Sequence, residues 1–243
     1  MPFIIAGIIL VTYLPKQNSN PFTYMKVINF SKQDTLLNLF LSELRDKDYQ
    51  KNSLLFRNNI KRIGQIMAYE ISKTLNYKET TVSTPLDDIA VKLPTDKIVL
   101  ATVFRAGLPL HEGFLSYFDK AENAFVSAYR YYRDKEATKV GIKIEYIATP
   151  DLTGKTLLIV DPMLATGGSM ELAYEAFLSK SKPARTIFAS VIASKSGVEF
   201  MKKHFPSDDF ELYCGAIDPI LNEQKYIVPG LGDAGDLEYG GKL

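Results

Sequence analysis

The chain has 243 residues, of which 46% are hydrophobic and 23% are charged. This is enough apolar material for one large or two small globular domains. A formal net charge of +1 excludes a strongly basic protein, so charge gives no reason to expect nucleic acid or a membrane surface as the main partner. The single cysteine, Cys214, excludes an internal disulfide and a metal site built from several cysteines. Cys214 lies in an apolar run and is expected to be a small buried side chain. We expect a cytoplasmic protein.

The first residues of the chain differ from the rest. Phe3–Leu14 is largely apolar, but the run is shorter than the ~18–20 residues that span a bilayer. No Lys or Arg precedes it, so the run lacks the basic start of a secretory signal. We therefore expect residues 1–24 to be an extension outside the folded domain. Residues 25–243 contain no repeat and no break in composition, so we expect them to form one domain.

Two amphipathic helices are predicted near the start of this domain. Apolar residues three and four positions apart predict them at Leu36–Leu44, with Asp34 as the N-cap, and at Ile60–Leu75. The following segment, Thr80–Pro94, is mixed and is expected to contain a short strand and a turn.

Strands and helices then alternate along the chain. Continuous apolar runs predict buried strands, and these runs are Ile98–Phe104, Ala124–Tyr129, Thr156–Val160, Thr186–Ile192 and Leu212–Ile217. Helices are expected after Pro109, at Met170–Leu178 and at about 196–204. A charged loop is expected at Arg130–Gly141, followed by an alternating ribbon at Ile142–Ile147. This order predicts an α/β fold with a mainly parallel sheet, in which ligands bind beyond the carboxyl ends of the strands.

The stretch Lys155–Met170, KTLLIVDPMLATGGSM, combines a buried strand, an acid, a Gly-rich turn and a helix start. Backbone N–H groups at a helix start lack partners, and paired glycines let a phosphate come close to the backbone. The stretch therefore predicts a phosphate-binding loop. Asp161 can accept hydrogen bonds from ribose hydroxyls or balance a developing positive charge, and it can equally cap the following turn. The spacing is compatible with each of these roles.

The best-known phosphate motifs do not match this loop. No Lys follows the glycines, as a P-loop requires, and no Gly-x-Gly-x-x-Gly occurs in the first strand–helix turn. Asp161–Ser169, DPMLATGGS, instead resembles the phosphoribosyl-diphosphate motif of the type I phosphoribosyltransferases. Its Asp-Pro start is similar to the uracil phosphoribosyltransferase family. Val103–Pro109 and Tyr226–Asp236 resemble two further segments of that family, and Tyr69-Glu70 matches a pair on an early helix.

This resemblance implies a fold and a reaction. The fold is a mainly parallel sheet flanked by helices, with a β-ribbon arm and a C-terminal base-binding hood at residues 218–243. The reaction transfers phosphoribosyl from 5-phospho-α-D-ribose 1-diphosphate (phosphoribosyl diphosphate) to N1 of uracil, giving UMP and diphosphate. The resemblance also favours a homodimer or a higher homo-oligomer.

The resemblance also assigns residues. Arg105, Asp161 and Asp233 are the expected catalytic residues, with Mg²⁺ as the cofactor, bound through the substrate diphosphate and Asp233. Arg105 and Arg130 are expected on the diphosphate, with Arg130 preferred to Arg133 because it stands 25 residues after Arg105, the family interval. The ribose and 5′-phosphate are assigned to Asp161, Pro162, Met163, Leu164, Ala165, Thr166, Gly167, Gly168 and Ser169, and uracil is assigned to Ile227, Gly232, Asp233 and Ala234.

Some features depart from the family or lie outside its motifs. Where the family has a basic residue and then Phe-Gly-Thr, this chain has Leu237–Gly241, LEYGG. The two histidines, His111 and His204, lie outside the motifs and are expected to be surface or structural residues. Two alternatives stay open: a non-catalytic nucleotide-binding regulator with the same fold, and a phosphoribosyltransferase for another base.

Overall fold

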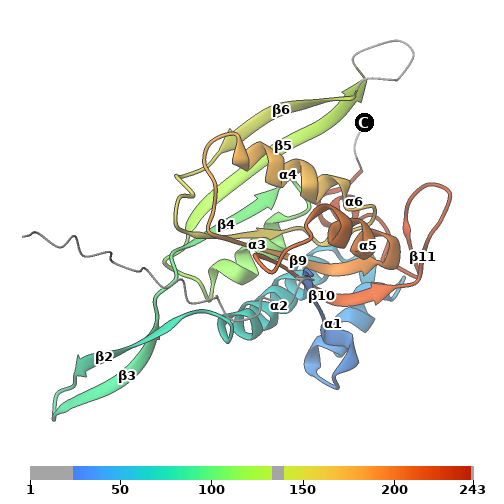
Figure 1. Cartoon of the computed structure of the whole chain (residues 1–243). Helices are drawn as coiled ribbons and strands as arrows, with labels where there is room; N and C mark the ends of the chain where they lie inside the picture. The colour runs from blue at the N-terminus through green and yellow to red at the C-terminus, as the bar shows by residue number, and fades with distance from the viewer. Residues whose placement is uncertain (1–23, 133–139, 242–243) are drawn as a thin grey trace, which may run out of the picture.

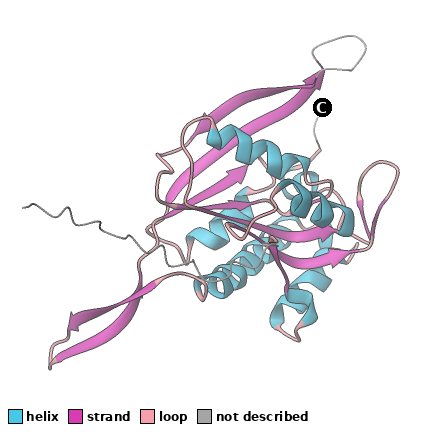
Figure 2. Cartoon of the chain, in the orientation of Figure 1, coloured by secondary structure: helices cyan, strands magenta, loops and turns pink. Residues whose placement is uncertain are grey.

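The computed structural model describes the backbone of residues 24–132 and 140–241, and the side chains of these residues outside 128–144. Its centre is an eight-stranded sheet (Figures 1 and 2). The strands are β1 (Lys26–Asn29), β4 (Ile98–Val103), β5 (Glu122–Tyr132), β6 (Val140–Ala148), β7 (Thr156–Val160), β8 (Met163–Leu164), β9 (Arg185–Ser194) and β10 (Phe210–Asp218). They run in the order β1-β10-β9-β7-β4-β5-β6, with β8 paired to β9, and every pair is parallel except β5–β6. The predicted α/β fold with a mainly parallel sheet is confirmed.

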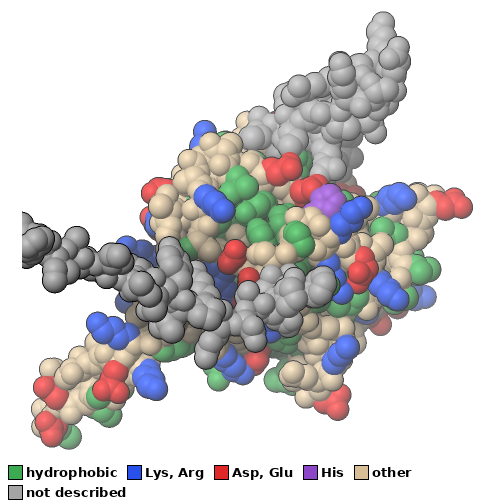
Figure 3. All heavy atoms as spheres, in the orientation of Figure 1, with side chains coloured by type: hydrophobic (Ala, Val, Ile, Leu, Met, Phe, Trp, Pro, Cys, Tyr) green, Lys and Arg blue, Asp and Glu red, His purple; other side chains and the backbone are tan. Residues whose placement is uncertain are grey.

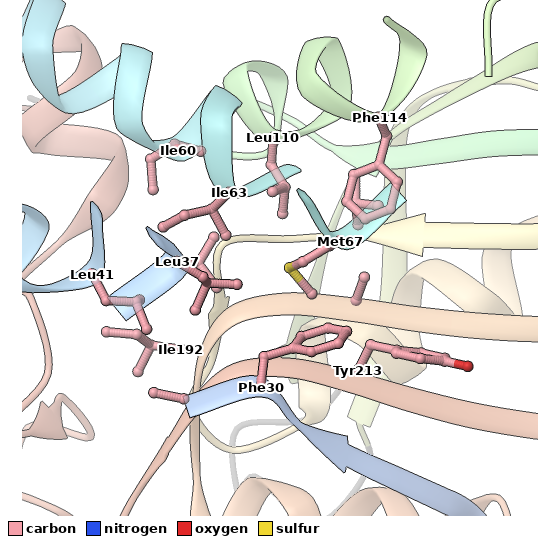
Figure 4. Packing of buried hydrophobic residues seen from close by; sticks show 14 of the residues in the cluster. Phe30, Leu37, Leu41, Ile60, Ile63, Met67, Leu110, Phe114, Ile192 and Tyr213 are labelled. Carbon is pink, nitrogen blue, oxygen red and sulfur yellow. The ribbon is translucent and has the colours of Figure 1, made fainter. Parts of the chain in front are cut away.

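Helices cover both faces of the sheet. They are α1 (Leu36–Arg45), α2 (Ser53–Ser72), α3 (Leu108–Leu115), α4 (Gly168–Leu178) and α5 (Lys195–His204), with 3-10 helices η1 (Phe30–Lys32) and η2 (Tyr49–Lys51). One core packs α1, α2 and α3 against the sheet (Figure 4), and a second packs α4 and α5 against its other face. Strand β7 contributes Leu158 and Val160 to the first core and Leu157 and Ile159 to the second. Because both faces of β7 are buried, its sequence is continuously apolar.

Two local predictions are wrong. Helix α1 begins at Leu36, so Thr35 occupies the N-cap position with an extended backbone, and Asp34 lies one residue too early to cap it. Arg130 lies in strand β5, where its backbone is in register with Ile142, and not in a loop. The antiparallel pairing with β6 satisfies the backbone there, so the strand continues although the sequence has become polar.

A separate ribbon forms between α2 and the sheet. Strands β2 (Tyr77–Ser83) and β3 (Asp88–Pro94) pair antiparallel over seven residues each and extend away from the body (Figure 1). The sequence predicted only a short strand and a turn here.

On the face drawn in Figure 3, positive and negative side chains of the described residues are interspersed. Among the helices in the described ranges, none has the length and apolar character needed to cross a bilayer. Cys214 is fully buried on β10, as expected, and burial raises the pKa of its thiol to about 12.

The last part of the chain packs around the carboxyl ends of the strands. It contains a hairpin of β11 (Ile220–Leu221) and β12 (Ile227–Val228), followed by α6 (Ala234–Tyr239). We call residues 218–241 the hood. Its elements are short, yet Ile227, Leu231 and Ala234 belong to the core that contains α1 and α2.

Candidate active site

A cavity of about 310 Å³ opens where the carboxyl ends of β4 and β7 meet the hood. This is the edge at which open α/β sheets bind ligands. Three segments line it, and these are Val103–Ala106 after β4, Asp161 with Met163, Ala165 and Ser169 after β7, and Lys225–Ile227 with Gly232–Gly235 from the hood. The structure therefore brings together residues that are more than a hundred positions apart in the chain.

The loop after β7 has the form predicted for phosphate binding. Helix α4 follows it, and the residue at its N-cap, Gly167, has a φ of +86° and makes no side-chain cap hydrogen bond. In the first turn, the N–H of Gly168 donates to Oγ1 of Thr166 at 3.5 Å. The N–H groups of Ser169 and Met170 have no acceptor among the described residues and are available to an anion. A Cβ on Gly167 would lie 2.4 Å from the ring of Phe200, so both the backbone angle and the packing require glycine.

The residues of Asp161–Ser169, which are predicted to bind the ribose and the 5′-phosphate, divide into two groups. Asp161, Met163, Ala165 and Ser169 line the cavity. The other members of the loop do not line it, and of these Pro162 and Leu164 are buried beneath the loop, Gly167 and Gly168 lie at the start of α4, and Thr166 is exposed.

Asp161 caps the turn after β7 and also lies at the cavity. Its Oδ1 accepts a hydrogen bond from the N–H of Met163 at 3.1 Å, so it caps the turn, and its side chain also lines the cavity. Burial raises the pKa of Asp161 to about 6, although the hydrogen bond from Met163 acts in the opposite direction.

Arg105 follows β4 and points toward the hood. Its Nη2 donates to the carbonyl oxygen of Gly240 at 2.7 Å and lies 3.4 Å from Oδ1 of Asp236. Its guanidinium carbon is 5.9 Å from the centre of the Tyr239 ring. The side chain therefore lines the cavity and also touches the last turn of the hood.

The second predicted arginine falls at the limit of the described side chains. The backbone of Arg130 belongs to β5, but its side chain, like all of Arg133, lies outside the described residues. The preference for Arg130 over Arg133 stays a prediction.

The predicted base-binding residues all line the cavity from the hood. Ile227 and Ala234 are buried, Gly232 has a φ of +91°, and Oδ1 of Asp233 accepts a hydrogen bond from the N–H of Asp236 at 3.0 Å, which caps α6. These four residues therefore form part of the hood side of the cavity.

The family model for uracil phosphoribosyltransferase matches residues 31–241. The chain belongs to the uracil phosphoribosyltransferase family. It is 54% identical over 219 residues to the uracil phosphoribosyltransferase of Porphyromonas gingivalis, covering 90% of this chain and 100% of that protein. It is 37% identical over 203 residues to the enzyme of the same name from Pyrococcus furiosus, covering 82% of this chain and 84% of that protein. Among solved structures, the AQ2163 protein of Aquifex aeolicus superimposes with a TM-score of 0.76 at 29% identity, covering 89% of this chain and 99% of that one.

In this uracil phosphoribosyltransferase family member, the tail that departs from the family motif places an acid in the interior. Glu238 is only 1% exposed, and neither of its carboxyl oxygens has a hydrogen-bond partner among the described residues. Burial, followed by the charge of Asp161, raises the pKa of Glu238 to about 9. Arg57 on α2 acts against this shift and also donates to the carbonyl oxygen of Glu238.

Local sequence patterns contain little sign of Glu238 and Arg57. Glu238 stands in a short segment without clear periodicity, and its only signal was the mismatch with the family motif. Arg57 lies before the predicted helix Ile60–Leu75, because α2 begins earlier than predicted, at Ser53, and nothing in the local pattern singled Arg57 out. Distant partners determine the positions of both residues, so local patterns do not reveal them.

Both histidines lie away from the cavity, as predicted. His111 is buried on α3, where its ring contacts Phe125 at 5.1 Å between centroids, and burial lowers its pKa. It is therefore structural and not a surface residue. His204, at the end of α5, pairs with Glu171 and stacks on Phe200.

Proposed function

We propose that the chain transfers the phosphoribosyl group of phosphoribosyl diphosphate to N1 of uracil, giving UMP and diphosphate. One observation carries this proposal: a single cavity is lined by the loop Asp161–Ser169 and by the hood segment Ile227–Ala234. A donor on the loop and an acceptor on the hood would face each other in that cavity. Membership of the uracil phosphoribosyltransferase family supports the same reaction.

The loop side is assigned to the donor. The first turn of α4 and Gly167 before it would bind the 5′-phosphate, because backbone N–H groups without a helical partner and the helix dipole favour an anion there. Asp161 would accept hydrogen bonds from the ribose hydroxyls as a carboxylate. Arg105 would bind the diphosphate, since its planar guanidinium presents a fork of donors to phosphate oxygens. Arg130 is proposed as a second diphosphate ligand.

The hood side is assigned to uracil. Ile227, Gly232 and Ala234 would contact the base, largely through backbone N–H and C=O groups. Asp233 is placed between the two substrates and would reach the donor as well. If the backbone recognises the base, then base selection depends on where these peptide groups lie more than on the side chains of the residues.

The reaction then depends on positioning and electrostatics. Uracil N1 attacks the anomeric carbon, the new N1–C1′ bond forms as the bond from C1′ to diphosphate breaks, and the N1 proton is released. Positive charge develops on the ribose in the transition state. The carboxylates of Asp161 and Asp233 would stabilise that charge, and Arg105 would stabilise the negative charge of the leaving diphosphate.

Magnesium fits the chemistry of the cavity only as a substrate-bound ion. Asp161 and Asp233 supply carboxylate oxygens, the donors that Mg²⁺ prefers. The described residues contain no group of three or more His, Cys, Asp or Glu side chains that could hold a metal ion by themselves. Asp233 would therefore share the ion with the diphosphate, where Mg²⁺ would neutralise charge on the leaving group. Homo-oligomer formation, the cytoplasmic location and the separation of residues 1–24 from the domain remain predictions.

The proposal is tested by measuring the release of diphosphate from phosphoribosyl diphosphate in the presence of Mg²⁺. Release should require uracil and should be accompanied by an equal amount of UMP. Hypoxanthine, guanine and orotate are the control bases. Release with hypoxanthine but not with uracil would overturn the choice of base, and a lack of release with every base would favour a nucleotide-binding regulator.

A further inference from the structure

We infer that Arg45, Gln50 and Asp218, which lie outside the cavity, form a clamp that positions the base-binding segment of the hood. The inference rests on the proposed function, because it assigns to the clamp the affinity for uracil. These three are positioning residues, since none of them lines the cavity.

The first half of the clamp holds the peptide groups of Gly230. Arg45, in the last turn of α1, forms two 2.8 Å hydrogen bonds with the carboxylate of Asp218 at the end of β10. Asp218 Oδ2 also accepts from the N–H of Gly230 at 2.8 Å, and Arg45 Nη1 donates to the carbonyl oxygen of Gly230 at 3.0 Å. The ion pair thus forms hydrogen bonds with both the N–H and the C=O of Gly230.

The second half of the clamp holds the next residue. Gln50 in η2 donates through Nε2 to the carbonyl oxygen of Leu231 at 2.7 Å and to that of Leu44, at the end of α1, at 2.6 Å. Gly232, which follows at once, lines the cavity. Two consecutive hood carbonyls are therefore fixed by side chains that reach in from the start of the domain.

The turn inside the clamp has little freedom of its own. Gly230 has a φ of +62°, and a Cβ there would lie 2.0 Å from the carbonyl oxygen of Ile227. The backbone of Gly230 therefore packs closely against the carbonyl group of Ile227, a residue assigned to the base. Both ends of the assigned segment, Ile227 and Gly232–Ala234, are connected to the clamped pair Gly230–Leu231.

The hood needs such external bonds because its own secondary structure is small. Strands β11 and β12 pair over only two residues each, and α6 has six residues. Recognition of a base by backbone groups requires placement to within about 0.5 Å. We therefore assign that precision to the clamp rather than to the hairpin or to α6.

Two conservative variants test the clamp. Arg45→Lys keeps the charge but replaces the planar fork with a single ammonium, so it cannot make the same set of bonds to Asp218 and Gly230. Gln50→Met keeps the length of the side chain and removes the two donated bonds. In each variant, KM for uracil should rise about tenfold, with KM for phosphoribosyl diphosphate changed by less than about twofold.

Arg185→Lys is the matched control. Arg185 pairs with Glu211 and donates to Thr74 through both terminal nitrogens, and its side chain is 21% exposed against 25% for Arg45. Glu211 and Asp218 are also similar, with side chains 11% and 7% exposed. The control ion pair lies on β9 and β10 and makes no hydrogen bond to the hood. Arg185→Lys should leave KM for uracil unchanged even if it lowers the unfolding temperature.

A second measurement does not depend on activity. Hydrogen exchange of peptides covering residues 226–235 should be faster in unliganded Arg45→Lys and Gln50→Met, by tenfold or more, and unchanged in Arg185→Lys. Equal rises in both KM values, an unchanged KM for uracil, or equal exchange in all three variants would overturn the clamp. Failure of the proposed function would show itself separately, as a native chain that does not use uracil, and the exchange experiment would still decide whether the clamp exists.

Discussion

The loop after β7 and the hood line the same cavity but are built in different ways. The loop connects a strand with both faces buried to an eleven-residue helix, and its residues Met163 and Leu164 form β8, which pairs with β9 in the main sheet. The hood has a two-residue hairpin pairing and a six-residue helix, and bonds from α1, η2 and α2 hold it. The comparison teaches that one half of a site can be part of the main sheet while the other half is held in place by side-chain hydrogen bonds from distant elements.

Arg105 lines the cavity and donates to the hood, and as the proposed diphosphate ligand its removal should have the largest effect. Arg105→Ala should lower kcat/KM about 10³-fold, or about 4 kcal/mol, because the charge on the departing diphosphate loses its main protein partner. Steady-state rates with both substrates measure this loss.

The control for that prediction is His111→Ala. His111 is buried against Phe125 and does not line the cavity, so this change should reduce the unfolding temperature and leave turnover per folded molecule within about threefold. Similar losses of turnover in the two variants would contradict the assignment of Arg105.

The next prediction concerns Glu238 in the hood. Its pKa is raised from 4.5 to about 9 in the folded protein. Between these values the folded state binds more protons than the unfolded state, so Glu238 makes the protein less stable as the pH rises through this range. Glu238→Gln should therefore increase the free energy of unfolding by about 3 kcal/mol at pH 7, with the difference vanishing near pH 4.5. Urea unfolding of both proteins across this range is the measurement, and parallel curves would show that Glu238 is not a buried neutral acid.

A smaller effect is expected from Asp161 in the loop. Because its pKa is raised to about 6, the carboxylate that we assign to the ribose is present above this pH and is lost below it. From pH 7 to pH 5, kcat/KM for phosphoribosyl diphosphate should fall about tenfold, and Asp161→Asn should remove this dependence on pH while lowering activity at every pH. A native profile that is flat from pH 7 to pH 5 would exclude Asp161 as the group whose ionisation matters.

The smallest effect should follow from Tyr239 in the hood. The guanidinium carbons of Arg57 and Arg105 lie 5.8 and 5.9 Å from the centre of its ring. Tyr239→Leu should raise KM for phosphoribosyl diphosphate about threefold, and Tyr239→Phe should change it by less than about twofold, because the ring and not the hydroxyl contacts the arginines. A larger effect of Tyr239→Phe would point to a role for the hydroxyl.

The sequence was most informative where the determinants are local. The apolar run Thr156–Val160, the acid after it and the paired glycines identified the donor loop, and the order of strands and helices identified the fold. The hood residues Ile227 and Gly232–Ala234 were found through a motif, without any account of what holds them.

Other features escaped prediction because their causes are distant. Helix α1 begins at Leu36, so its N-cap is Thr35 and not Asp34. The charged residues from Arg130 onward predict a loop, but pairing with β6 continues strand β5 to Tyr132. The clamp of Arg45 and Asp218 joins residues 173 positions apart, and no local pattern signals such a bond.

The division of the cavity into a donor side and an acceptor side is tested most directly by hydrogen exchange with two ligands that do not react further. Ribose 5-phosphate should slow exchange in peptides covering residues 161–169 only. UMP, which adds the base, should slow exchange in those peptides and also in residues 226–235. Equal protection of residues 226–235 by the two ligands, or none by UMP, would contradict the assignment of the base to the hood.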